Sequence, residues 1–241
     1  MPRGRGANCN PANRFEPLAL ERDADWYPAQ DPAPQTRFYR DWSQSIISHN
    51  DSPDIPFRAG INPYRGCEHG CSYCYARITR EYLGFSAGLD FESRIMVKPE
   101  APGLLRRELS APKWKPQALA MSGVTDCYQP VERRLQLTRA CPAVLAEFRN
   151  PVVIITKNHL VTRDIDLLRE LAAGQAVQVN ISINSLNPDL AARLEPRASL
   201  PKLRLAAVEA LAMARLPRVS AVTTPRVIQL GVVKSELACR V

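Results

Sequence analysis

The sequence has no apolar stretch approaching the roughly 20 residues that a membrane-spanning helix needs. Its densest apolar run, Val152 to Ile155, has only the length of a strand. The first residues are charged, but no apolar segment follows them, so no secretory signal is visible. Low-complexity tracts and internal repeats are absent as well. These absences argue against a membrane protein or a secreted protein, and we expect a cytoplasmic location.

Cysteine is sparse and odd in number, with seven residues in a chain of 241. In a reducing compartment this count predicts metal ligands or free thiols rather than a disulfide framework. Charged residues make up 23% of the sequence and hydrophobic residues 45%. This balance argues against a wholly disordered chain.

The net charge of +8 is concentrated near the end of the chain, where residues 197–241 hold eight Lys and Arg against two Asp and Glu. A basic patch can attract the phosphates of a nucleic acid. A solvated basic tail explains the same distribution at least as well.

Proline separates an N-terminal extension from the rest of the chain. Residues 1–58 contain eight of the 21 prolines and little apolar periodicity, which predicts an extended arm rather than a domain. We expect aromatic side chains to dock this arm, and the candidates are Trp26, Tyr27, Phe38, Tyr39 and Trp42. Residues 59–215 form the predicted core domain, and residues 216–241 are predicted to be an atypical basic tail.

Within the core domain, short apolar runs alternate with amphipathic segments. The runs predict strands at 61–65, 117–122, 152–156 and 176–183. The segments predict helices at 75–83, 103–109 and 162–173, and further helices opening at Thr138, Asn187 and Ser199. Four strands alternating with crossover helices predict an α/β fold with a parallel sheet. Chemistry is then expected at the C-terminal ends of the strands.

Three cysteines lie within eight residues, directly after the first predicted strand. Cys67, Cys71 and Cys74 follow the spacing C-x₃-C-x₂-C, and thiolates this close suit an iron–sulfur cluster or zinc. A structural zinc site needs four ligands, so it would have to recruit His69 or His159. Three thiolates on a [4Fe–4S] cluster would leave one iron free to bind another group.

This spacing, with aromatic Tyr73 before the last cysteine, resembles the signature of the radical S-adenosylmethionine (SAM) superfamily. The strings NPYRGCEHGCSYCYAR, MSGVTDCYQPVE, VVIITKN and LEPRA are similar to its spore photoproduct lyase-like branch, also called DNA repair photolyase-like. The resemblance covers roughly residues 55–215. It implies a partial parallel (β/α) barrel that is incomplete at its C-terminus, because the pattern stops after four of the family's six βα units. A truncated or frame-altered gene product would explain this stop.

The resemblance also implies an enzyme of the lyase-like kind, with a [4Fe–4S] cluster and SAM as cofactors. In this superfamily, one electron from the reduced cluster cleaves SAM to methionine and a 5′-deoxyadenosyl radical, which takes hydrogen from a substrate. An electron donor of the flavodoxin or ferredoxin type and, for this branch, a nucleic-acid substrate are the implied partners. A non-catalytic zinc- or cluster-containing nucleic-acid binder and an inactive fragment are the alternatives.

By resemblance, Cys67, Cys71 and Cys74 are the cluster ligands, and the later strand ends contact SAM. The cofactor-binding candidates are Tyr73, Ser122, Gly123, Thr125, Asp126, Lys157, Ser182 and Asn184. Cys127 is the catalytic candidate, because spore photoproduct lyase uses a cysteine at this strand end as a hydrogen-atom donor. The matching position here is Gly123, so a packed thiol is the alternative role for Cys127.

Overall fold

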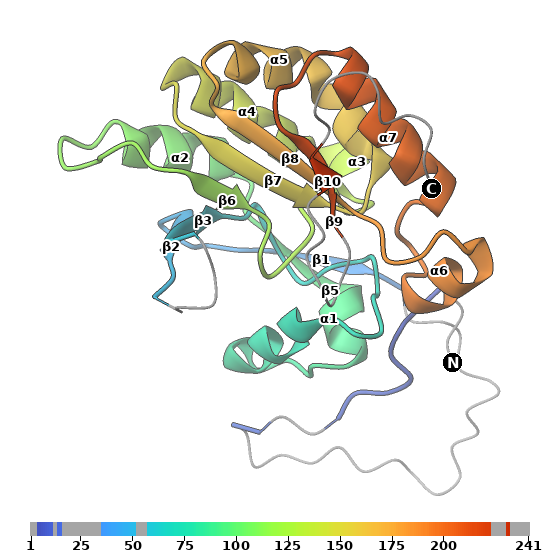
Figure 1. Cartoon of the computed structure of the whole chain (residues 1–241). Helices are drawn as coiled ribbons and strands as arrows, with labels where there is room; N and C mark the ends of the chain where they lie inside the picture. Colours follow the sequence, from blue (N-terminus) through green and yellow to red (C-terminus); the bar gives the residue numbers. More distant parts are fainter. Residues whose placement is uncertain (1–3, 12–13, 16–34, 52–56, 223–229, 232–241) are drawn as a thin grey trace, which may run out of the picture.

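A seven-stranded sheet forms the centre of the computed structural model, which describes residues 4–11, 14–15, 35–51, 57–222 and 230–231 (Figure 1). The strand order is β10-β9-β8-β7-β6-β3-β2. Five neighbouring strands are parallel: β3 (Ala59–Ile61), β6 (Leu119–Met121), β7 (Val152–Thr156), β8 (Val177–Ser182) and β9 (Val219–Val222). The edge strands β2 (Ile47–His49) and β10 (Leu230–Gly231) are antiparallel to their neighbours.

Helices cover one face of this sheet, as Figure 1 shows. They are α2 (Ala101–Leu109), α4 (Leu137–Glu147), α5 (Ile165–Ala173) and α7 (Pro201–Met213). Each contributes a fully or almost fully buried leucine to the core, namely Leu105, Leu145, Leu168 and Leu211. Burying one such side chain stabilises the fold by about 1.5–3 kcal/mol, so amphipathic periodicity determines which way each helix faces.

A second, three-stranded sheet lies beyond the other face, with the order β1-β5-β4. Its strands are β1 (Arg37–Arg40), β5 (Arg94–Val97) and β4 (Tyr64–Arg65). The 3₁₀ helix η2 (Tyr75–Leu83) and helix α1 (Leu89–Ser93) lie between β4 and β5 along the chain. Shorter helices complete the connections: α3 (Glu132–Leu135), the 3₁₀ helix η3 (His159–Asp164) and α6 (Pro188–Leu194).

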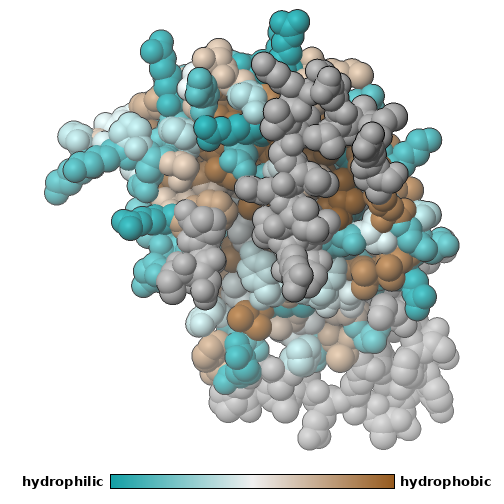
Figure 2. All heavy atoms as spheres, viewed as in Figure 1, coloured by the Kyte–Doolittle hydropathy of each residue, from teal (hydrophilic) through white to brown (hydrophobic). Residues whose placement is uncertain are grey.

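The polarity of the exposed side chains varies across the surface. On the face seen in Figure 2, hydrophilic side chains project around the rim and hydrophobic atoms lie between them. Among the described residues, no helix combines the length and apolar character needed to cross a membrane.

The predicted fold class is confirmed, since βα units build a parallel sheet that stays open within the described residues. The strand at 152–156 matches β7, and 75–83 matches η2. Asn187 caps α6 as predicted, accepting hydrogen bonds from the amides of Asp189 and Leu190.

Three local predictions are wrong. Residues 61–65 are not one strand: β3 ends at Ile61, and Tyr64 then pairs with Val97 of the second sheet. Thr138 lies inside the first turn of α4, where its hydroxyl donates to the Cys127 carbonyl at 2.5 Å. Ser199 precedes the start of α7 by two residues and instead accepts a hydrogen bond from the His159 amide.

Both ends of the chain contain predictions that fall partly outside the described residues. Trp26 and Tyr27 of the N-terminal arm lie outside them, as does most of 223–241. Within the arm, residues 37–40 form β1, which pairs in parallel with β5. Within 216–241, β9 pairs in parallel with β8 and extends the main sheet.

Candidate functional site

The three spaced cysteines lie on one loop that follows β4. Cys67 and Cys71 are buried, and Cys74 is partly exposed. Gly66 and Gly70 take positive φ angles of 81° and 65°, a backbone that glycine adopts at no steric cost. These two positions let the chain curl so tightly that all three thiols share one short loop.

Hydrogen bonds hold the backbone of this cysteine loop from outside. The Cys67 amide donates to the Phe91 carbonyl at 3.0 Å, and the Ser72 amide donates to the Leu194 carbonyl at 2.9 Å. Arg77 donates through Nη2 to the Cys71 carbonyl at 2.8 Å. The ligand-bearing loop is therefore fixed by partners from distant parts of the sequence.

Burial sets the protonation of the free thiols. It raises the pKa of Cys71 to about 12, although the nearby Lys157 charge lowers it. Burial is also the main cause of the raised pKa of Cys67 and of Cys74. Thiols with such pKa values stay protonated at neutral pH unless a metal displaces the proton. This loop suits a metal-bound thiolate better than a free thiolate nucleophile.

The donor set fits an iron–sulfur cluster better than a zinc ion. His69 is buried, with Nδ1 3.3 Å from Asp126 Oδ2 and Nε2 3.3 Å from Asn158 Nδ2. Both ring nitrogens therefore face other partners. Within the described residues, no group of three or more His, Cys, Asp or Glu side chains converges on a point where a single ion would sit. A cluster, whose several irons each take one thiolate, does not require that convergence.

The segment after β6 approaches the cysteine loop with unusual backbone angles. Ser122 has φ 147° and Gly123 has φ 100°. A Cβ placed on Gly123 would meet no atom within 4 Å, so open space adjoins this glycine. Thr125 Oγ1 donates to the Gly66 carbonyl at 2.5 Å. The end of β6 is thus joined to the start of the cysteine loop and leaves room beside Gly123.

Asp126 joins the end of β7 to the cysteine loop. Its carboxylate accepts hydrogen bonds from Thr156 Oγ1 and from the Lys157 amide, both at 2.7 Å, in addition to the contact with His69. Burial alone would raise the pKa of Asp126, but His69 and these hydrogen bonds outweigh it and lower the pKa to about 2. An ionised carboxylate with these partners positions the site rather than transferring a proton at neutral pH.

Lys157, at the end of β7, directs its charge towards the cysteine loop. Its ammonium lies 6.0 Å from the centre of the Tyr73 ring. The same charge lowers the pKa of both Cys71 and Cys74, against the larger effect of burial. Lys157 is therefore placed to attract a negatively charged group bound beside these thiols.

A buried ion pair at the end of β8 holds Tyr73. Glu195 and Arg204 form this pair, and each side chain is only 1% exposed. Glu195 also accepts hydrogen bonds from the Tyr73 hydroxyl and, at 2.8 Å, from Asn184 Nδ2. Arg204 donates to the Ser182 carbonyl at 2.9 Å. Of the predicted residues, Tyr73, Ser182 and Asn184 are thereby brought together.

Glu195 and Arg204 were not predicted from the sequence. The motif LEPRA contains Glu195, but a charged residue at the end of a short helix gives no sign that it is buried. Arg197 of the same motif pairs with Glu68 at 3.1 Å.

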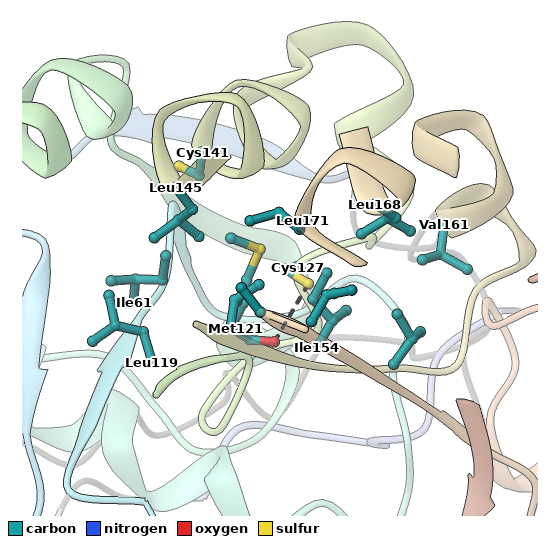
Figure 3. Close-up of a cluster of buried hydrophobic side chains, with 14 of the residues drawn as sticks. Ile61, Leu119, Met121, Cys127, Cys141, Leu145, Ile154, Val161, Leu168 and Leu171 are labelled. Carbon is teal, nitrogen blue, oxygen red and sulfur yellow. Dashed lines mark hydrogen bonds between the residues drawn. The ribbon is translucent and has the colours of Figure 1, made fainter. Parts of the chain in front are cut away.

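Cys127 does not lie with the predicted residues that surround the cysteine loop. It is fully buried in the main core, near Met121, Ile154 and Leu171 (Figure 3). Its thiol lies 3.7 Å from the Met121 carbonyl as a weak donor. Burial raises its pKa well above the usual value. This placement corresponds to the packed thiol that the sequence allowed as the alternative role of Cys127.

Comparison with known proteins identifies the family. The sequence model described as the Radical SAM superfamily matches residues 61–237. The chain belongs to the radical SAM superfamily. This is a family of enzymes that use a [4Fe–4S] cluster and SAM, which confirms the predicted superfamily and its cofactors.

Two relatives at the sequence level carry the name of uncharacterized proteins. One from Mycobacterium tuberculosis is 39% identical over 162 residues, which is 67% of this chain and 48% of that protein. One from Methanocaldococcus jannaschii is 30% identical over 151 residues, covering 63% of this chain and 54% of that protein. The radical SAM chain thus spans about half the length of these relatives.

Solved structures of spore photoproduct lyase share the fold. A Cys-to-Ser variant gives a TM-score of 0.55 at 19% identity, covering 78% of this chain and 51% of that one. The enzyme complexed with dinucleoside spore photoproduct gives a TM-score of 0.54 at 19% identity, covering 78% and 50%. These likenesses confirm the predicted spore photoproduct lyase-like fold of this radical SAM chain.

Proposed function

We propose that this chain is the SAM-cleaving core of a radical enzyme, in which Cys67, Cys71 and Cys74 hold a [4Fe–4S] cluster. The observation that carries the proposal is that three thiols share one short loop held by distant backbone partners, while Lys157, at the C-terminal end of β7, lies beside this loop, 6.0 Å from the centre of the Tyr73 ring. When bound, the reduced cluster supplies the electron that cleaves SAM to methionine and a 5′-deoxyadenosyl radical, which takes hydrogen from the substrate.

The strand ends would hold SAM by complementary charge and by shape. Lys157 would attract the carboxylate of SAM. The open space beside Gly123, between Ser122 and Thr125, would admit its ammonium group. Tyr73 would pack near the adenine, and Ser182 with Asn184 would contact the ribose or carboxylate. Asp126 would hold these strand ends in place through its contacts with Thr156 and Lys157.

The proposed substrate class is nucleic acid. Its support is the shared fold with spore photoproduct lyase, one structure of which contains a dinucleoside spore photoproduct. A small redox protein of the flavodoxin or ferredoxin type would supply the electron. Cys127 has no part in this proposal, because its thiol lies in the core.

The test is anaerobic reconstitution of the full chain with iron and sulfide. We expect about four irons and four sulfides per chain, and 5′-deoxyadenosine after addition of dithionite and SAM. Cys67→Ala should abolish both results. Cys141→Ala, which alters a buried thiol in the core, is the matched control and should retain both.

Two results would contradict the proposal. A colourless chain containing one zinc would exclude the cluster. A filled cluster without 5′-deoxyadenosine, combined with salt-sensitive binding to DNA, would favour a non-catalytic nucleic-acid binder.

A further inference from the structure

Residues 4–11, here called the N-terminal strap, lie directly against the cysteine loop. A Cβ added to Gly6 would fall 1.8 Å from the Gly70 carbonyl oxygen and 3.0 Å from the Ser72 amide nitrogen. Only glycine fits at such an approach. The strap therefore contacts the loop backbone between Cys67 and Cys74.

A buried carboxylate connects the strap to Cys71. Glu92 is fully buried, and its Oε2 accepts a hydrogen bond from the Gly6 amide at 3.0 Å. Its Oε1 accepts from Arg77 Nη2 at 2.5 Å, and the same Nη2 lies 2.8 Å from the Cys71 carbonyl. One carboxylate and one guanidinium thus separate the strap from a proposed cluster ligand.

Arg5 makes a second connection, on the Cys67 side of the loop. Its guanidinium is buried and donates to the Glu92 carbonyl at 2.8 Å and to Thr36 Oγ1 at 3.0 Å. Thr36 Oγ1 also accepts from Arg197 at 3.1 Å, and Arg197 pairs with Glu68, the neighbour of Cys67. Arg5 therefore belongs to a network that reaches the loop beside Cys67 and, through Glu92 and Arg77, at Cys71.

The far end of the strap is fixed to the first turn of α1. Asn10 and Asp90 exchange two hydrogen bonds, of 3.0 and 2.9 Å. The Cys9 carbonyl accepts from the Leu89 amide at 3.3 Å, and a Cβ on Gly88 would lie 2.0 Å from the same carbonyl oxygen. These contacts place the strap in one defined position across the loop.

We propose that the N-terminal strap is a positioning element of the cluster site, through which Arg5 and Gly6 fix the Cys71 backbone and exclude water from the cysteine loop. Solvent exposure and hydrogen bonding around the ligands set the stability and reduction potential of iron–sulfur clusters. The inference rests on the proposed function for its effect on a cluster, whereas the contact itself is a property of the metal-free chain.

The first measurement is hydrogen–deuterium exchange of the metal-free full chain. Gly6→Ala should speed exchange of the backbone amides in residues 67–75 by about tenfold, the effect of losing one or two hydrogen bonds. Gly103→Ala adds the same methyl group on α2, where no atom lies within 4 Å, and should leave exchange in this loop unchanged. Unchanged loop exchange in Gly6→Ala would overturn the proposal.

The second measurement follows the reconstituted chain. The cluster of Gly6→Ala should bleach several-fold faster in air than that of the original chain or of Gly103→Ala, and its midpoint potential should shift. Faster loop exchange with an unchanged cluster lifetime and potential would refute the positioning role. Absence of a cluster from every variant would refute the proposed function, while the exchange data would still test the strap.

Arg5→Ala provides an independent variant if Gly6→Ala lowers the thermal stability of the whole chain. It removes the bonds to Glu92 and Thr36 without adding atoms. It should give the same faster exchange in residues 67–75. If loop exchange in Arg5→Ala were as slow as in the original chain, that result would also contradict the positioning role of the strap.

Discussion

Replacing Arg204 by methionine should destabilise the fold more than most single substitutions. The change leaves Glu195, which is 1% exposed, without its cation. It also removes the donors to the Ser182 and Ser199 carbonyls, at 2.9 and 2.7 Å. Breaking a buried ion pair from one side costs about 3–5 kcal/mol. That loss is a large share of the roughly 5–15 kcal/mol by which such domains are stable.

The assay is urea unfolding of the metal-free chain, followed by far-UV circular dichroism. Glu195→Met, Arg204→Met and the double variant form a cycle, and the double variant should lose clearly less than the sum of the two single losses. Arg106→Met is the control, because the Arg106–Glu147 pair is about half exposed, at 50% and 51%, and should matter far less. A small effect of Arg204→Met, or strictly additive losses, would refute the reasoning.

Two further substitutions test other parts of the structure. Cys127→Ser places a hydroxyl in the apolar core and should lower the free energy of unfolding by about 1–3 kcal/mol, with the iron content after reconstitution unchanged; loss of iron would place Cys127 in the site instead. Gln136→Gly relieves a left-handed φ of 53° between α3 and α4 and should raise the free energy of unfolding by about 1 kcal/mol. Glu209→Gly, at an exposed position in the interior of α7, should lower it by about 1 kcal/mol, so a similar fall in both glycine variants would contradict the strain argument.

The parts of the site that were predictable are those encoded over short distances along the chain. The cysteine loop follows from the spacing within residues 67–74. Strand ends with polar side chains follow from apolar runs such as Val152–Thr156. Because neighbouring parallel strands end at one edge, Asp126 and Lys157 could be expected near the loop, and their hydrogen bond is present.

The missed features depend on partners that lie far apart or on which side a residue faces. Cys127 directly follows Asp126, yet Asp126 bonds to the end of β7 and Cys127 lies in the core, because the chain makes a turn here, in which the Gln129 amide donates to the Asp126 carbonyl. Arg37–Arg40 lacks an apolar pattern and becomes a strand only by pairing with Arg94–Val97. Burial of the Glu195–Arg204 pair depends on how α7 packs beside β8, which no local pattern encodes.

The contacts of the cysteine loop also constrain when it can form during synthesis. Ser72 and Tyr73 bond to Leu194 and Glu195, 122 residues later in the chain. At a translation rate of about 5–20 residues per second, those partners are made roughly 6–24 s after the loop. During that interval Ser72 and Tyr73 lack these two partners. The cysteine loop therefore reaches the bonded form described above only after translation has passed Glu195, so its final conformation is completed late in synthesis.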